Sequence, residues 1–197
     1  MRHEPVAYRF NAAGAHSASR ELGVAVVSAW KRTRPGAKVV PRDVAAQPPA
    51  HRAPVADADD PGWRDGHAIL DEFLARTWSW SWPVPMYNFS IPGTLKAWID
   101  RIAVSGRTFR HGANGPEGLA GGKRMIIASS RGASTTRTRP VSSSATPRVR
   151  FRGLTDTRIV RAEGANPGPE QKARAIGAVL ARIRTRGRIA ARPAARV

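Results

Sequence analysis

The residues best suited to hold a ligand follow a short apolar run and precede an amphipathic pattern, between positions 84 and 102. There Pro85 and Met86 lead into Tyr87-Asn88-Phe89, and Pro92 stands at the expected start of a helix. A planar amphipathic ligand needs apolar walls and a few fixed hydrogen-bond donors, which an aromatic-amide turn after a buried strand supplies. The pattern predicts a binding site at the carboxyl edge of a sheet. The alternative, in which both aromatics belong to the core, is disfavoured by the Asn between them.

Two further loops carry residues of the same kind. Ser17 and Ser19 stand at the expected start of a helix, where hydroxyls, amides and the helix dipole suit a phosphate monoester. An ordinary N-cap is the alternative, and the residues alone favour the cap. The third loop, Ser129-Ser130-Arg131-Gly132, follows an apolar run; its alternative is a strand-end turn with a solvated Arg131.

The elements that must position these loops alternate along the chain. Apolar runs predict strands at residues 6–10, 37–42, a run ending at 85, 124–129 and 157–162. Helical spacing predicts a helix with Leu22, Ala25, Val26, Ala29 and Trp30 on its apolar face, and further helices near 65–75, from 92 to Gly106, and at 169–183. Such alternation is typical of an α/β protein whose parallel sheet is covered on both faces. Residues 45–62 and 133–150 are expected to be irregular.

The composition limits the chemistry of the chain. Its 197 residues, 41% of them hydrophobic, predict one domain over residues 1–185 and a basic tail over 186–197. Without Cys, and with its five His scattered, the chain is expected to hold no metal and to take redox chemistry from a cofactor. Neither a signal peptide nor a membrane span is recognisable, so a cytoplasmic protein without a membrane partner is expected.

Charge and one aromatic run are unusual. The formal net charge is +19, and the excess Arg is concentrated in residues 131–161 and 182–197. This predicts nonspecific adhesion to polyanions at low salt, but no specific nucleic-acid partner, because no aromatics are interleaved with Arg in the tail.

The run Thr77-Trp78-Ser79-Trp80-Ser81-Trp82 occupies the position of the third strand, where Val and Ile are expected. One hypothesis is that this run and residues 133–150 are translated out of an ancestral frame.

Residues 85–132 closely resemble the FMN-dependent NADH-azoreductase family, also called FMN-dependent NADH:quinone oxidoreductases. The resemblance rests on Met86-Tyr87-Asn88-Phe89-Ser90-Ile91-Pro92, Leu95-Lys96-Ala97-Trp98, Arg107-Thr108-Phe109-Arg110 and Asn114-Gly115-Pro116-Glu117-Gly118-Leu119. Weaker similarity covers residues 17–51 and 153–183, including Ala162-Glu163-Gly164.

The resemblance implies a fold, a cofactor and an activity. The fold is a flavodoxin-like, doubly wound parallel sheet of five strands with helices on both faces. FMN is tightly bound, NADH is the co-substrate, and quinones or aromatic azo compounds accept two electrons in a ping-pong scheme. No side chain is required as an acid or base catalyst. The family forms homodimers in which the partner completes each site, and Phe109 with residues 114–119 are the candidates for that neighbourhood.

The resemblance also assigns cofactor contacts in this chain. Asn11 stands where the family usually has Ser, and Ala133 stands in place of a second Gly of the third loop. The implied contacts are Asn11, Ser17, Ala18 and Ser19 near the phosphate, Pro85, Met86, Tyr87, Asn88 and Phe89 along the ring, and Ser130, Arg131, Gly132 and Ala133 at its pyrimidine side.

Two other functions remain open from the sequence. One is a catalytically impaired flavodoxin-like remnant that no longer holds FMN, because the third strand and the segment after Arg131 are altered. The other is a basic polyanion-binding protein, whose affinity would fall steeply with salt.

Overall fold

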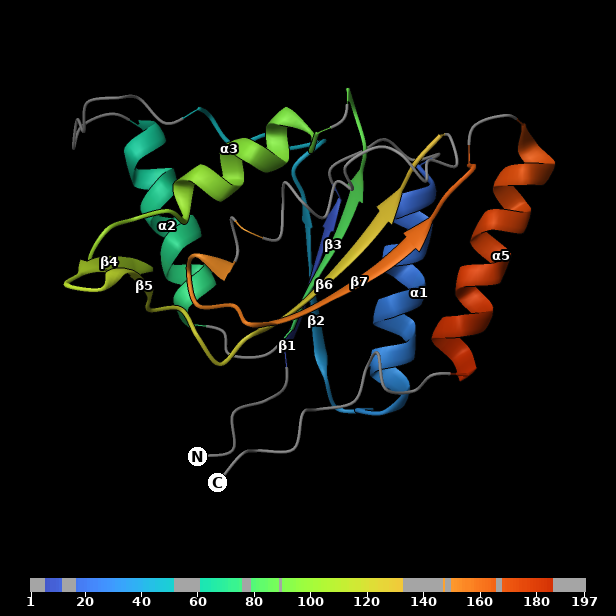
Figure 1. Ribbon diagram of the computed structural model, residues 1–197, viewed down its shortest axis with the longest axis horizontal. Helices are drawn as coiled ribbons and strands as arrows, with labels where there is room; N and C mark the ends of the chain where they lie inside the picture. Colours follow the sequence, from blue (N-terminus) through green and yellow to red (C-terminus); the bar gives the residue numbers. More distant parts are fainter. Residues whose placement is uncertain are drawn as a thin grey trace.

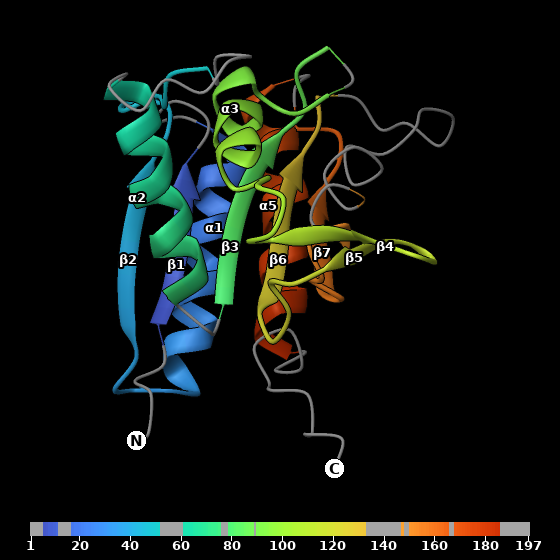
Figure 2. The same cartoon turned by 90° about the vertical axis from the view of Figure 1, so that its left-hand side faces the viewer.

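The structure is a computed structural model that describes residues 6–11, 17–51, 61–75, 79–88, 90–132, 147, 150–165 and 168–185. Its centre is a parallel five-stranded sheet with the strand order β2-β1-β3-β6-β7. Helices α1 and α5 cover one face, and α2 and α3 cover the other (Figures 1 and 2). The elements are β1 Val6–Asn11, α1 Ala18–Arg32, β2 Lys38–Asp43, α2 Pro61–Ala75, β3 Ser79–Pro85, α3 Gly93–Arg101, β4 Phe109–Gly112, β5 Gly115–Gly118, β6 Arg124–Ser130, β7 Asp156–Ala162 and α5 Pro169–Thr185.

The five expected strands and four expected helices are confirmed, with changes at their ends. The helix expected from Pro92 to Gly106 is shorter: Pro92 is its N-cap, and the helix ends at Arg101. Gly106 instead has a φ of +78° and lies in a turn in which its N–H donates to Phe109 O at 2.8 Å. The helix expected near 65–75 begins earlier, at Pro61.

The hairpin of β4 and β5 was not expected. Its strands are four residues each and pair antiparallel, with Gly112 opposite Gly115. Neither strand alternates apolar and polar residues, so the period-two signal is missing. Asn114-Gly115 is a turn signal, and Gly115 adopts a φ of +106°, which glycine tolerates at little cost.

The third strand forms in spite of its unusual composition. Trp82 and Val84 are fully buried in the core beneath α2 and α3. The Trp82 ring meets Trp98 edge to face at 5.4 Å, and Phe73 meets Trp98 in the same way at 5.9 Å. Large aromatic side chains therefore fill the layer in which branched aliphatic residues were expected.

The two prolines of β3 lie where their missing N–H groups do least harm. Met86 N–H donates to Ser130 O at 3.1 Å, so the backbone N–H groups of the alternate residues before it in β3 also point toward β6. The backbone nitrogens of Pro83 and Pro85, which carry no hydrogen, then point toward β1, and the ladder between β1 and β3 ends at Arg9 and Ser81. The ladder from β3 to β6 continues to Pro85 opposite Ser130. The proline pattern thus keeps β3 tied to β6 up to the carboxyl edge.

Pro83 also determines which residue α1 can place above it. A Cβ atom added to Gly23 of α1 would overlap the ring of Pro83. We expect Gly23→Ala to lower the free energy of unfolding by roughly 1–3 kcal/mol, because overpacking at a rigid ring displaces the helix. Gly177 of α5 is the control: it is exposed, and a Cβ there meets nothing within 4 Å.

Gly177→Ala is expected to raise the free energy of unfolding by roughly 0.5–1 kcal/mol through helix propensity. Urea denaturation of both variants measures the contrast. Equal effects in the two helices would show that Pro83 does not constrain α1.

Candidate functional site

The three predicted loops leave the sheet at one edge. In parallel strands all carboxyl ends lie at the same edge, and here those of β1, β3 and β6 are neighbours. The chain runs from β1 outward to β2 on one side and to β3 on the other. This reversal is the switch point at which open α/β sheets bind ligands. We call these loops the first corner (residues 11–19), the second corner (85–90) and the third corner (129–133).

The first corner ends at the amino terminus of α1. Ser17 is the N-cap by backbone position, but its side chain makes no capping hydrogen bond; instead Ser17 Oγ lies 2.9 Å from Ser19 Oγ. Glu21 N–H donates to Ser17 O at 3.2 Å. The backbone N–H groups of the residues before Glu21 at the start of α1 have no acceptor within the helix. A pair of hydroxyls beside free amides suits an anion better than an ordinary side-chain cap. Asn11 ends β1, and residues 12–16 lie outside the described residues.

The second corner is a tight turn with strained backbone. Tyr87 and Ser90 exchange two hydrogen bonds, with Tyr87 N–H to Ser90 O at 3.1 Å and Ser90 N–H to Tyr87 O at 2.9 Å. Asn88 has a φ of +44°, and no other described non-glycine residue has a positive φ. Tyr87 is 52% exposed, so the alternative that it belongs to the core is wrong. Pro85 is buried, Met86 packs partly against the core, and Phe89 lies outside the described residues.

The third corner is bonded to the second. Ser130 O accepts the hydrogen bond from Met86 N–H, so the two loops are fixed relative to each other. Ser129 was not among the predicted contacts, yet its Oγ is buried and has no hydrogen-bond partner among the described residues. Gly132 is half-buried, and Ala133 lies outside the described part of the chain. A buried hydroxyl without a partner at a sheet edge is a donor suited to a polar ligand edge.

Arg131 is not a solvated strand-end residue. It is 3% exposed, and its Nη1 lies 3.7 Å from Glu163 Oε1. Its N–H donates to Ala162 O at 3.0 Å. Sequence reasoning missed Glu163 as a partner because the two residues are far apart in the chain and adjacent strands bring them together.

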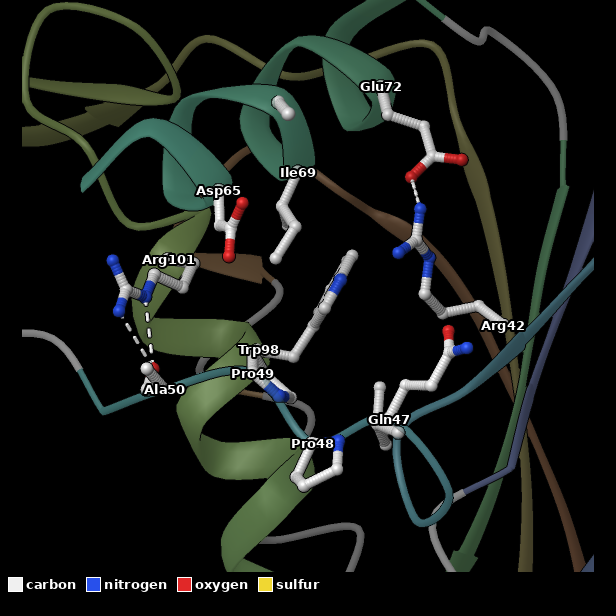
Figure 3. A pocket seen from close by; sticks show the side chains of 12 residues that line it. Arg42, Gln47, Pro48, Pro49, Ala50, Asp65, Ile69, Glu72, Trp98 and Arg101 are labelled. Carbon is white, nitrogen blue, oxygen red and sulfur yellow. Dashed lines mark hydrogen bonds and ion pairs between the residues drawn. The ribbon is translucent and has the colours of Figure 1, made fainter. Parts of the chain in front are cut away.

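A separate pocket lies between α2, α3 and the segment after β2 (Figure 3). Its volume is about 490 Å³, and Trp98 and Ile69 form its apolar wall. Arg101 donates to Ala50 O at 2.9 and 3.1 Å, and Arg42 pairs with Glu72. None of the predicted contacts lines this pocket. Arg42 and Arg101 therefore bond protein oxygen atoms at the edge of this pocket.

Among the described residues, no group of three or more His, Asp or Glu residues is close enough together to hold a metal ion. No helix in that part of the chain combines the length and apolar character needed to cross a membrane.

The fold and the edge site are those of the flavodoxin-like class, and the model of the family described as "Flavodoxin-like fold" matches residues 10–186. An FMN-dependent NADH:quinone oxidoreductase of Xanthomonas oryzae pv. oryzae is 44% identical over 180 residues, covering 88% of this chain and 91% of that protein. One of the same name from Rhizobium meliloti is 44% identical, covering 83% and 86%. The chain therefore belongs to the flavodoxin-like family and, within it, to the FMN-dependent NADH:quinone oxidoreductases.

Solved structures agree on the fold. An azoreductase from Bacillus anthracis str. Sterne aligns with a TM-score of 0.79 at 21% identity, covering 93% of this chain and 98% of the other. A second, an FMN-dependent NADH-azoreductase from Bacillus anthracis str. Ames Ancestor in complex with FMN, aligns with a TM-score of 0.74 at 18% identity, covering 92% and 98%.

The left-handed backbone of Asn88 yields a test of the second corner. Asn88→Ala is expected to lower the free energy of unfolding by about 1 kcal/mol, because a Cβ disfavours a positive φ, whereas Asn88→Gly is expected to keep it within about 0.5 kcal/mol. Asn114→Ala is the control, since Asn114 is an exposed turn residue with a negative φ. Denaturant unfolding measures all three variants. A loss as large for glycine as for alanine would contradict a backbone role.

Proposed function

We propose that this protein is an FMN-dependent oxidoreductase that passes two electrons from NADH to quinones and aromatic azo compounds. The observation that carries the proposal is the bonded arrangement of the second and third corners beside the start of α1, at the switch point of the sheet. Relatives at 44% identity that bear the name FMN-dependent NADH:quinone oxidoreductase support the same cofactor and electron donor.

The described residues fit the chemistry of FMN. Its phosphate suits the amides and paired hydroxyls of Ser17 and Ser19, and its flat ring suits the exposed Tyr87 beside Met86. The pyrimidine edge carries acceptors and donors. They match Ser130, the backbone of the third corner and Ser129 Oγ, which has no hydrogen-bond partner within the described part of the chain. When bound, FMN supplies hydride-transfer chemistry that no side chain of this Cys-free chain provides.

This chain's own residues have three tasks in the proposed reaction. The first corner binds the phosphate, the second provides an apolar wall and excludes water, and the third orients the polar edge of the ring. In the net reaction NADH and one proton from solvent convert a quinone to the hydroquinone, and NADH becomes NAD⁺. We propose that both substrates use the same face in turn, which is a ping-pong order.

A homodimer in the cytoplasm is part of the proposal. Phe109 and Phe151 lie 4.6 Å apart between ring centres, with Phe151 38% and nearby Leu119 41% exposed. Apolar side chains at the surface beside the hairpin of β4 and β5 are compatible with the partner contact that the family resemblance implies.

The remnant alternative loses one of its two supports. The third strand pairs with β6 from Ser79 to Pro85, so its altered composition does not remove the second corner. The segment 133–146, which is the other support, lies outside the described residues.

Cofactor binding tests the proposal directly. Purified protein titrated with FMN is expected to turn yellow with a shifted flavin spectrum, and NADH under argon is expected to bleach it; a quinone then restores the colour. Riboflavin, which lacks the phosphate, is expected to bind at least about 100-fold more weakly, because charge-assisted hydrogen bonds at the first corner are lost. Protein that stays colourless in excess FMN would favour the remnant.

The hydroxyl pair of the first corner can be tested separately. Ser19→Ala is expected to raise the dissociation constant for FMN about tenfold while leaving that for riboflavin nearly unchanged, since one hydrogen bond to a phosphate is removed. Ser28→Ala, an exposed position on the same helix, is the control and is expected to leave both constants unchanged. Equal losses for FMN and riboflavin in Ser19→Ala would place the phosphate elsewhere.

A further inference from the structure

An ion pair between an Arg of the β6 segment and an acid of the β7 segment lies at each end of these two strands. At the amino end Arg124 Nε lies 2.7 Å from Asp156 Oδ2, and beyond the carboxyl end Arg131 Nη1 lies 3.7 Å from Glu163 Oε1. Arg124 begins β6 and Asp156 begins β7, whereas Arg131 follows β6 and Glu163 follows β7. In each pair the Arg side chain is buried, 6% and 2% exposed, and the acid is partly exposed, 28% and 37%. Only the second pair lies at the edge that carries the three corners.

The backbone around Arg131 continues this connection. Arg131 N–H donates to Ala162 O at 3.0 Å, and Arg131 O accepts from Ala165 N–H at 2.9 Å. Between those two contacts lies Gly164, with a φ of +74° that lets residues 163–165 turn around Arg131. Through Met86 N–H and Ser130 O the same chain of bonds reaches the second corner.

A buried guanidinium constrains its surroundings strongly. Removing its charge from water is unfavourable unless an acid or fixed acceptors face it, and its planar fork accepts few geometries. The Arg131 guanidinium faces Glu163, and the Arg131 backbone is bonded to Ala162 and Ala165, so residues 162–165 are tied to the third corner. The motif Ala162-Glu163-Gly164, which the binding site itself leaves without a role, thereby has one.

We propose that Arg131, Glu163 and Gly164 are positioning residues that fix the third corner for FMN, and that the Arg131 guanidinium acts through Glu163 without touching the cofactor. The inference rests on the proposed function for its ligand. Its structural part, the fixing of the third corner, concerns the protein alone and can be measured without FMN.

The charge pair is tested by comparing Glu163→Gln with Asp156→Asn. Glu163→Gln is expected to raise the dissociation constant for FMN roughly three- to tenfold, as expected for a partly exposed ion pair. Asp156→Asn removes the acid that faces Arg124 and Arg158 at the far end of the same strands and is expected to leave FMN affinity unchanged. Equal weakening by both variants, or weakening by neither, would overturn the proposal.

A second pair of variants tests the turn. Gly164 and Gly122 have φ values of +74° and +76°, and a Cβ at either meets nothing within 4 Å. An alanine therefore strains the backbone equally at both, but only Gly164 adjoins the third corner. Gly164→Ala is expected to weaken FMN binding roughly three- to tenfold and Gly122→Ala to leave it unchanged. The opposite order, or no difference, would contradict a positioning role.

Combining variants separates positioning from direct contact. Arg131→Lys keeps the charge and loses the fork, so it is expected to weaken FMN binding in the wild-type background and much less in the Glu163→Gln background. Undiminished weakening in that background would show that Arg131 contacts the cofactor itself.

Amide hydrogen exchange on FMN-free protein distinguishes failure of this inference from failure of the proposed function. Glu163→Gln is expected to speed exchange at Met86, Arg131 and Ala165 roughly three- to tenfold, and Asp156→Asn to leave those amides unchanged. If wild-type protein binds no FMN, the proposed function fails, and this exchange contrast still decides whether the pair fixes the corner. Unchanged exchange in Glu163→Gln would overturn the inference even if FMN binds.

Discussion

The candidate site depends on the hydrogen bond from Met86 N–H to Ser130 O. It is the first contact beyond the regular ladder of β3 and β6, and it holds two loops that carry different ligand-binding groups. It ties the turn at Asn88 to the end of β6, where the ladder with β7 already holds Ser129 and Ser130. Because the donor and acceptor are backbone groups, their position is determined by strand register and not by side-chain identity.

That register explains why so unusual a third strand is tolerated. Side chains of β3 alternate between the layer under α2 and α3, where Trp82 and Trp98 pack together, and the layer under α1, where Pro83 meets Gly23. The prolines leave the β6 side of the ladder complete and shorten only the β1 side. A segment whose composition is typical of a loop can therefore form a central strand when each proline and each large aromatic side chain lies on a side of the strand that accommodates it.

How far the sequence predicts this molecule differs from element to element. Helix α1 was predictable because Leu22, Val26 and Ala29 repeat at helical spacing and are indeed buried. The hairpin at 109–118 was not, since its short strands carry no periodic signal. Helix α3 was overextended because nothing between Arg101 and Gly106 breaks the apolar pattern, although the chain turns there through Thr108 Oγ1, which donates to Ile102 O at 2.6 Å.

The candidate site also has features that the sequence predicts and features that it does not. Loop positions followed from strand ends, and the exposure of Tyr87 from the turn signal around Asn88. The environment of Arg131 did not follow, because a guanidinium at a strand end is usually solvated. It forms an ion pair with Glu163, which follows the neighbouring strand β7, and such long-range pairs leave no mark in a single sequence.

Burial of arginine also changes the meaning of the +19 charge. Among the described residues, Arg101, Arg124, Arg131 and Arg152 are all buried. Arg101 bonds the carbonyls of Ala50 and His51, and Arg152 Nη2 donates to Ile99 O at 3.1 Å. Arg101, Arg124 and Arg152 thus act as internal hydrogen-bond donors that join distant segments, and Arg131 forms an ion pair with Glu163. Part of the basic excess therefore belongs to the architecture of the sheet and its loops and not to a surface for polyanions.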